Sequence, residues 1–179
     1  MPLKLSIVVG SPKPRSRTLK VTETFASKLF GPSSHSAEVI DLAEHRDKIL
    51  SWPSVHMDAL TARVASRDVA IFASPTYKAT YTGLLKAFLD RYPANGLAGL
   101  TAIPLLTGAD QTHAMGPTFT LAPLLAELGA IVPGRGLYFV ISQMDRLDEI
   151  AQMDADHYAF ALSRLAKVAA ALPTESAGA

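Results

Sequence analysis

The chain contains no cysteine among its 179 residues, which excludes a disulfide framework, thiolate metal sites and thiol catalysis. It also has little net charge: 17 Lys and Arg against 16 Asp and Glu give a formal charge of +1. A net charge this small creates no electrostatic field over the whole protein that would attract nucleic acid or an acidic membrane. The sequence has no apolar run near the roughly 20 residues that span a bilayer, and no signal-peptide layout. We expect a cytoplasmic protein that binds neither nucleic acid nor membranes.

Several catalytic patterns are missing as well. The five histidines show no metal-ligand spacing, so no metal site is predicted. There is no G-x-S-x-G elbow for a serine hydrolase and no pair of carboxylates at strand ends for glycoside chemistry. Glycine is too sparse for a Walker A loop or a G-x-G-x-x-G fingerprint.

What is present is a regular alternation of strand-like and helix-like segments. Hydrophobic residues make up 49% of the chain and charged residues 18%, which is typical of a globular protein. The predicted strands are 3–9, 37–42, 69–73, 100–106 and 137–142. The predicted helices are 18–30, 55–65, 82–92, 119–128 and a final amphipathic helix marked by Tyr158, Leu162, Leu165, Ala169 and Leu172. This β-α alternation predicts an α/β protein with a doubly wound, five-stranded parallel sheet of the flavodoxin-like order 2-1-3-4-5. We expect one domain over residues 1–172 and a flexible tail over 173–179.

The loop after the first predicted strand has the composition of an anion site. Gly10 allows a tight exit from the strand, and Ser11, Ser16 and Thr18 supply hydroxyl groups next to a helix start. Lys13, Arg15 and Arg17 add positive charge. Because open α/β sheets bind ligands at the carboxyl ends of their strands, we predict a phosphate monoester here, against the alternative of an ordinary capped helix.

The loops after the third and fourth predicted strands would meet the same sheet edge. Pro75, Thr76, Tyr77 and Lys78 could offer backbone N–H groups and an aromatic wall to a flat heterocycle. Thr107 and Gly108 open the next loop, in which Asp110 is expected to face solvent or cap the following helix. His113 is a candidate contact for cofactor or substrate, or else an ordinary helix-start residue. Together the three loops predict a phosphorylated aromatic cofactor lying across the sheet edge.

Three motifs carry a resemblance to a known family. They are G-S-P-x-x-x-S-R-[ST], S-P-x-Y-K-A-x-Y-[ST]-G-x-L-K and T-G-x-x-x-x-H, beginning at Gly10, Ser74 and Thr107. The sequence resembles the NAD(P)H-dependent FMN reductases, above all those that supply reduced flavin to two-component monooxygenases of the alkanesulfonate, methanesulfonate and EDTA-degrading type. The resemblance implies hydride transfer from NAD(P)H to FMN, a partner monooxygenase and a homodimer or homotetramer that uses the helix after the second loop.

The resemblance also implies roles for particular residues. The FMN phosphate would be held by Ser11, Ser16, Arg17 and Thr18. The isoalloxazine would be contacted by Pro75, Thr76, Tyr77 and Lys78, and its pyrimidine side by Thr107 and Gly108. No catalytic side chain is named, because the reaction needs no protein acid or base.

Two departures from the family pattern bear on how the flavin is held. Ala109 stands where several relatives carry glycine, and Phe119 stands where the alkanesulfonate-type reductase has a tyrosine at a π-type helix insertion. Three other functions stay open: an enzyme that retains FMN and reduces quinones, azo dyes or metal ions, a flavodoxin-type electron carrier, and a non-enzymatic nucleotide-binding module. The near-neutral charge and the Ser/Arg loop disfavour the carrier, since flavodoxins are usually strongly acidic.

Overall fold

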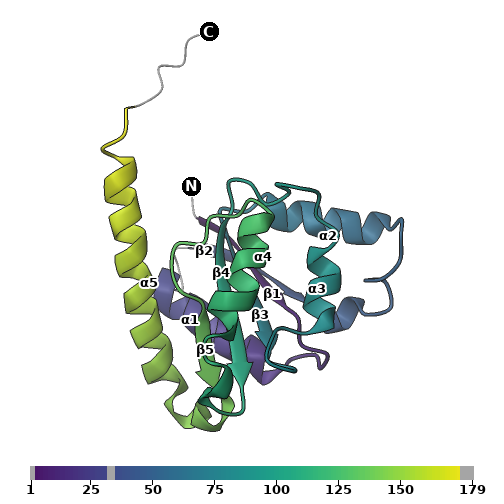
Figure 1. Cartoon of the computed structure of the whole chain (residues 1–179), viewed down its shortest axis with the longest axis horizontal. Helices are drawn as coiled ribbons and strands as arrows, with labels where there is room; N and C mark the ends of the chain where they lie inside the picture. The colour runs from purple at the N-terminus through teal and green to yellow at the C-terminus, as the bar shows by residue number, and fades with distance from the viewer. Residues whose placement is uncertain (1–2, 32–34, 174–179) are drawn as a thin grey trace.

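The computed structural model describes residues 3–31 and 35–173 as one α/β layer structure (Figure 1). The strands are β1 (Leu3–Val9), β2 (His35–Asp41), β3 (Val69–Pro75), β4 (Thr101–Gly108) and β5 (Leu137–Val140). All pair in parallel, in the order β2-β1-β3-β4-β5. This order confirms the predicted flavodoxin-like sheet. The order reverses beside β1, so β1 and β3 flank the point where such sheets bind ligands.

Helices cover both faces of the sheet (Figure 1). The α-helices are α1 (Arg17–Phe30), α2 (Val55–Ala65), α3 (Gly83–Leu89), α4 (Ala122–Glu127) and α5 (Leu147–Ala169). Shorter helical turns are η1 (Leu42–His45), η2 (Gln111–His113), η3 (Pro117–Leu121) and η4 (Ile141–Arg146), of which η3 is a π-helix. None of the described helices is long and apolar enough to cross a bilayer.

The central strands are buried on both sides, which explains their apolar runs over residues 7–9, 69–73 and 102–106. Val8 and Phe72 pack in the core under α2, α3 and α4. Ile7 and Ile71, one residue away in each strand, pack in the core under α1 and α5. Successive side chains of a strand alternate between faces, so each strand contributes to both cores and the sheet is rigidly held between the two helical layers.

The sequence located the helices better than it located their ends. Ser16 caps α1 by accepting a hydrogen bond from the Leu19 N–H at 3.2 Å, and Gly31, with φ of 69°, ends the helix as expected. The helix predicted over 82–92 ends at Leu89 instead, before the break imposed by Pro93. The fifth strand stops at Val140 rather than 142, because the chain turns into η4 there.

The C-terminal part of the chain differs from the prediction in where its helix begins. The final helix begins at Leu147, well before Tyr158, the first residue that marked it in the sequence. The sequence did not reveal this early start because several buried positions of the first turns are small alanines, such as Ala151. The predicted flexible tail over 173–179 falls, apart from Pro173, outside the described residues.

The apolar stripe of α3 packs inside the chain: Leu85, Phe88 and Leu89 are fully buried. Leu84, the fourth apolar residue of that stripe, is only half-buried, and the use of this helix in an oligomer stays a prediction.

Candidate active site

The first loop is fixed by hydrogen bonds at both of its ends. The Gly10 N–H donates to the Ala73 carbonyl at 2.7 Å, which ties the end of β1 to β3. A Cβ at Gly10 would lie 2.4 Å from the Cβ of Leu85, so only glycine lets α3 approach this closely. At the far end, the Arg15 N–H donates to the Asp41 carboxylate at 2.8 Å while Arg15 holds a positive φ of 50°. The loop therefore has a set shape before any ligand binds.

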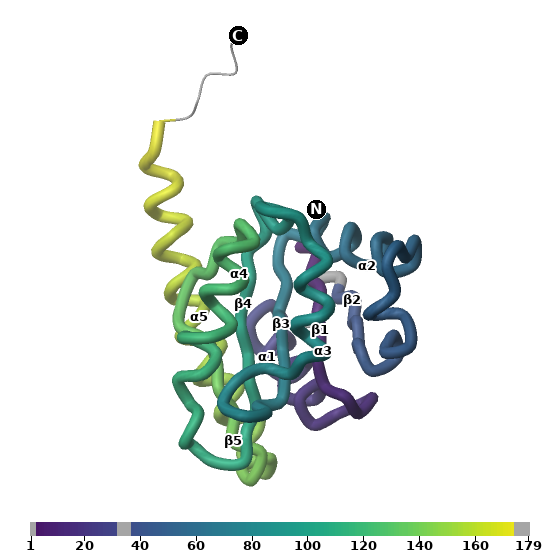
Figure 2. The backbone as a smooth tube through the Cα atoms, turned by 45° about the vertical axis from the view of Figure 1, so that its right-hand side comes forward, coloured from purple at the N-terminus to yellow at the C-terminus, as the bar shows by residue number. Residues whose placement is uncertain are grey.

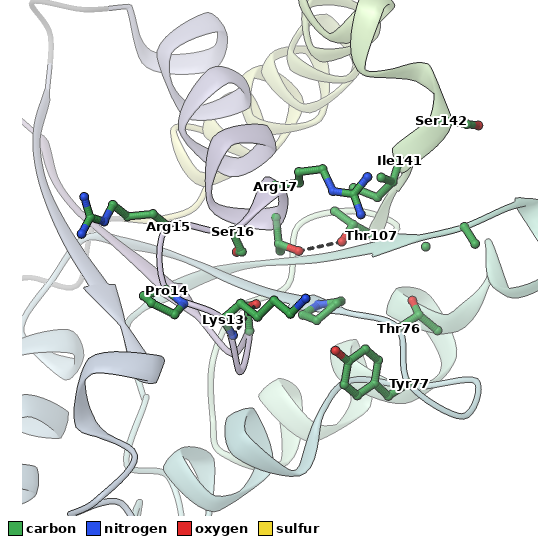
Figure 3. Close-up of a pocket in the computed structure, with 15 residues that line it drawn as sticks. Lys13, Pro14, Arg15, Ser16, Arg17, Thr76, Tyr77, Thr107, Ile141 and Ser142 are labelled. Atoms are coloured by element: carbon green, nitrogen blue, oxygen red, sulfur yellow. Dashed lines mark hydrogen bonds between the residues drawn. The ribbon is translucent and has the colours of Figure 1, made fainter.

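The start of α1 supplies the anion-binding groups. The Ser11 hydroxyl is buried and accepts a hydrogen bond from the Lys13 N–H at 3.2 Å. The first N–H groups of a helix lack intrahelical partners, and they lie where the helix dipole favours negative charge. In Figure 3 the guanidinium of Arg17 extends toward Ile141 and Thr107, whereas that of Arg15 points away from them. The predicted phosphate residues thus share one end of the site.

The second loop differs from the sequence-based prediction in how its backbone is used. The Thr76 N–H donates to the Thr107 carbonyl at 2.7 Å, and the Tyr77 N–H donates to the Thr80 carbonyl at 2.8 Å. The prediction that these two N–H groups face a heterocycle is therefore wrong, because the chain closes a tight turn with Lys78 at a φ of 53°. What Thr76 does offer is its hydroxyl, which is buried and has no hydrogen-bond partner.

The third loop is tied to the first and to β5. The hydroxyls of Thr18 and Thr107, both buried, form a hydrogen bond of 2.7 Å across the site (Figure 3). A Cβ at Gly108 would lie 1.8 Å from the Tyr138 hydroxyl, which donates to the Asp110 carbonyl at 2.9 Å. Glycine at 108 thus leaves room for the tyrosine that holds the loop.

Asp110 behaves as the sequence suggested. Its carboxylate accepts a hydrogen bond from the Thr112 N–H at 2.8 Å and caps η2. Hydrogen bonds from Thr112 lower the pKa of Asp110, so this exposed carboxylate is charged at neutral pH. It does not line the cavity. A carboxylate that would oppose charge build-up on a reduced ring is thereby kept outside the site.

The three loops enclose a cavity of about 720 Å³ along the carboxyl edge of the sheet (Figure 3). This volume is in the range of small-molecule and cofactor sites. The lining residues are Ser11, Lys13, Pro14, Arg15, Ser16, Arg17, Thr18, Pro75, Thr76, Tyr77, Thr107, Gly108, Ala109, Ile141 and Ser142. Three of them are basic and none is acidic. An anionic ligand therefore meets favourable charge and no opposing carboxylate along the lining.

Most of the residues predicted for the site meet in this cavity. Lys78 and His113 do not line it; both are exposed, on the turn after β3 and on η2 respectively. Sequence reasoning missed Ile141 and Ser142 at the start of η4, which follow the end of β5. Their position after a parallel strand was the available signal, since the carboxyl ends of all such strands meet one edge. Among the described residues no group of three or more His, Cys, Asp or Glu could hold a metal ion.

Comparison with known proteins decides the family. A model of the NADPH-dependent FMN reductase family matches residues 3–145. The chain belongs to this family. It is 29% identical over 130 residues to the FMN reductase (NADPH) of Escherichia coli strain K12, covering 72% of this chain and 68% of that protein. It is 30% identical over 142 residues to the NADH-dependent FMN reductase SfnF of Pseudomonas fluorescens strain Pf0-1, covering 76% of each.

A solved structure agrees with the sequence relatives. The apo form of the NADH:FMN oxidoreductase EmoB superposes with a TM-score of 0.76 at 28% identity, covering 88% of this chain and 89% of that one. The protein is thus an oxidoreductase of the FMN reductase family that uses NAD(P)H and FMN. The cavity fits FMN, since it pairs an anion-binding helix start with a buried, unpartnered Thr76 hydroxyl.

Proposed function

We propose that this FMN reductase binds FMN reversibly and supplies the reduced flavin to a separate monooxygenase. The observation that carries the proposal is the exposure of Tyr77, the one aromatic ring of the cavity lining: it is 53% exposed, so little of the chain covers a bound ring. Phe119, in the π-helix η3, is 69% exposed and does not line the cavity, so it does not cover the ring either.

The binding roles follow from the cavity's two ends. We assign the FMN phosphate to the hydroxyls of Ser11, Ser16 and Thr18 and to the first N–H groups of α1, with Arg17 neutralising its charge. We assign the isoalloxazine to the other end, against Pro75 and Tyr77 and beside the Thr107–Gly108 backbone. The free hydroxyl of Thr76 is the group most ready to bond a polar atom of the ring. Lys78 and His113, which lie off the cavity, are left without a direct role.

The protein's part in the reaction is binding and electrostatics. Bound FMN supplies the hydride acceptor, and NAD(P)H supplies the hydride. The lining carries three basic and no acidic residues, which lowers the cost of the negative charge that the ring gains. The cavity lining contains no Asp, Glu or His, in keeping with a reaction that needs no protein acid or base.

The alternative is an enzyme that keeps its FMN and reduces quinones or azo dyes. The same loops would serve it, and kinetics separate the two. With NAD(P)H and FMN varied together, reversible use of FMN predicts that FMN saturates as a substrate and that gel filtration strips it from the protein. A retained group instead predicts bound flavin after gel filtration and ping-pong kinetics with a quinone. Flavin that stays bound through dilution contradicts the proposal.

The phosphate assignment has its own test. Arg17→Gln removes one charge from the phosphate end of the cavity. We expect KM for FMN to rise at least about tenfold, because a charge-assisted hydrogen bond is worth about 1.5–3 kcal/mol. Riboflavin lacks the phosphate, so its KM should not change. Lys20→Gln, on the same helix but off the cavity, is the matched control. An equal effect of Arg17→Gln on FMN and riboflavin would show that Arg17 does not meet the phosphate.

A further inference from the structure

A second pocket lies beside the third loop, between η2, η3, β5 and α5. Its volume is about 210 Å³, and none of its residues lines the flavin cavity. Figures 1 and 2 both show the first half of α5 running beside β5, and these two elements form one side of the pocket. A cavity of about 150 Å³ in another protein holds benzene, so the second pocket has room for a small organic molecule. Its polar side chains are Gln111, Thr118, Arg135, Tyr138 and Asp154.

The segment that enters β5 is held against η3, which fixes the walls of the second pocket. The Gly136 N–H donates to the Thr118 hydroxyl at 3.0 Å. A Cβ at Gly136 would lie 2.5 Å from the Cβ of Pro117, so only glycine lets the two segments pass this closely. The Tyr158 hydroxyl of α5 donates to the Arg135 carbonyl at 2.6 Å. The pocket is therefore preformed, and a ligand does not need to order its walls on binding.

Asp154 occupies a position on the face of α5 that packs against the domain. It lies three residues after Ala151 and four before Tyr158, both of which are buried. In the described parts of the chain no hydrogen bond or ion pair reaches its carboxylate. Burial raises the pKa of Asp154, and the charges of Arg135 and His157 offset only part of this effect. Because a desolvated carboxylate without a partner destabilises a protein, Asp154 points to a partner that is not part of the chain.

Arg135 brings the opposite charge to the same pocket. It is exposed, and over residues 3–31 and 35–173 it forms no ion pair, either with Asp154 or with any other acid. A simple cation would be attracted by Asp154 and repelled by Arg135, and a simple anion would meet the reverse. A molecule that carries both charges satisfies both side chains at once. The pair therefore selects for a ligand with one positive and one negative group.

We propose that the second pocket binds a small zwitterion, whose cationic group pairs with Asp154 and whose anionic group pairs with Arg135. Amino acids and aminosulfonates belong to this class. Charge-assisted hydrogen bonds at both ends fix the orientation of the ligand as well as its affinity. The exposed Gln111 side chain supplies an amide for a further polar group. The site is separate from the flavin cavity, so the proposal does not depend on how FMN is used.

Tyr138 connects the second pocket to the flavin site. It lines the pocket, and its hydroxyl donates to the Asp110 carbonyl of the third loop at 2.9 Å. The same hydroxyl fills the space that Gly108 leaves, and Gly108 lines the flavin cavity. A zwitterion that packs against Tyr138 holds the third loop in its observed shape. It should therefore tighten FMN binding, and FMN should tighten zwitterion binding by the same factor.

The first test measures binding to the full chain without flavin, by isothermal titration calorimetry. The probes are glycine, β-alanine, γ-aminobutyrate, aminocaproate and taurine, with butyrate and butylammonium as analogues that carry a single charge. We expect at least one zwitterion to bind, and both analogues to bind at least about tenfold more weakly, because each lacks one charge-assisted contact and meets one repulsive charge. Butylammonium binding as tight as that of every zwitterion would contradict the proposal. So would the failure of all the zwitterions to bind at millimolar concentrations.

The second test removes the two charges one at a time. Asp154→Asn and Arg135→Gln should each weaken zwitterion binding at least about tenfold. Asp154→Asn should also bind butyrate more tightly than the wild type does, and Arg135→Gln should bind butylammonium more tightly, because each variant has lost the repulsive charge. Asp156→Asn, at an exposed position two residues along the same helix, is the matched control and should bind as the wild type does. A purely structural role of Asp154 predicts no such exchange of preference, and an unchanged zwitterion affinity in either variant overturns the assignment.

The third test measures the coupling between the two sites. The dissociation constant for FMN is determined by fluorescence titration with and without the zwitterion that binds most tightly in the first test. We expect it to fall about fivefold in the presence of that zwitterion, and Tyr138→Phe, which removes the hydroxyl that holds the third loop, should bring this factor close to one. Equal FMN affinity with and without the zwitterion would refute the coupling. Because the first test contains no flavin, a failure of the proposed function leaves its result unchanged, so the two failures are distinguishable.

Discussion

Thr82 links the first and second loops, and its replacement by valine tests how far the site depends on that link. The Thr82 side chain is buried at the N-cap of α3. Its hydroxyl donates to the Gly10 carbonyl at 2.5 Å and accepts a hydrogen bond from the Leu85 N–H at 3.2 Å. Its own N–H donates to the Ser74 hydroxyl at 2.9 Å. One residue thus joins the end of β1, the end of β3 and the start of α3.

Thr82→Val keeps the shape of the side chain and removes the hydroxyl. The lost N-cap costs about 1 kcal/mol, and the Gly10 carbonyl, left buried without this partner, costs about 1–3 kcal/mol more. We therefore expect a loss of about 2–4 kcal/mol in the free energy of unfolding, measured by urea denaturation. Because Gly10 begins the anion-binding loop, the dissociation constant for FMN should also rise, by about three- to tenfold.

Thr82→Ser is the control for this prediction, since it retains both hydrogen bonds of the hydroxyl. It should keep FMN affinity near the wild-type value and lose less than about 1 kcal/mol, for one buried methyl group. If valine and serine variants lose equal stability, the hydroxyl is not what joins the loops. If Thr82→Val is destabilised but binds FMN unchanged, the link supports the helix alone and the reasoning about the site fails.

Two further predictions concern the third loop and the partly buried Asp154. Gly108→Ala should weaken FMN binding about tenfold, because a Cβ at position 108 must displace Tyr138 and break its hydrogen bond to the Asp110 carbonyl. Ala109→Ser should not weaken binding. An FMN affinity of Gly108→Ala that equals the wild-type value in a fluorescence titration would contradict this. Burial raises the pKa of Asp154, so the folded protein keeps this proton to higher pH than the unfolded chain, and stability declines as pH rises between the two pKa values. Asp154→Asn should remove the decline and stabilise the protein at neutral pH, with no gain in urea melts at strongly acidic pH.

The sheet was predictable because its central strands carry apolar runs over residues 7–9, 69–73 and 102–106. Such runs are typical of strands that are buried on both faces of a sheet. The positions of the loops followed from the parallel order. What the sequence did not reveal was the use of individual N–H groups. The turn at Lys78 engages the Tyr77 N–H, and no residue type there demanded a positive φ. The early start of α5 was equally hidden, because Ala151 and Ala155 bury a helix face without a strong apolar signal.

The carboxylates around the site follow one rule that the sequence alone did not disclose. Asp41, the last residue of β2, lies beside the anion-binding loop and accepts hydrogen bonds from the Arg15 N–H at 2.8 Å and the Ala43 N–H at 3.3 Å. Asp110, beside the third loop, accepts one from the Thr112 N–H. Both acids are engaged by backbone donors and neither lines the cavity. Asp41 and Asp110 fix the shape of the loops, while the charged residues that line the cavity are all basic. The cavity can therefore bind FMN, which gains further negative charge on reduction, although two carboxylates lie close to it.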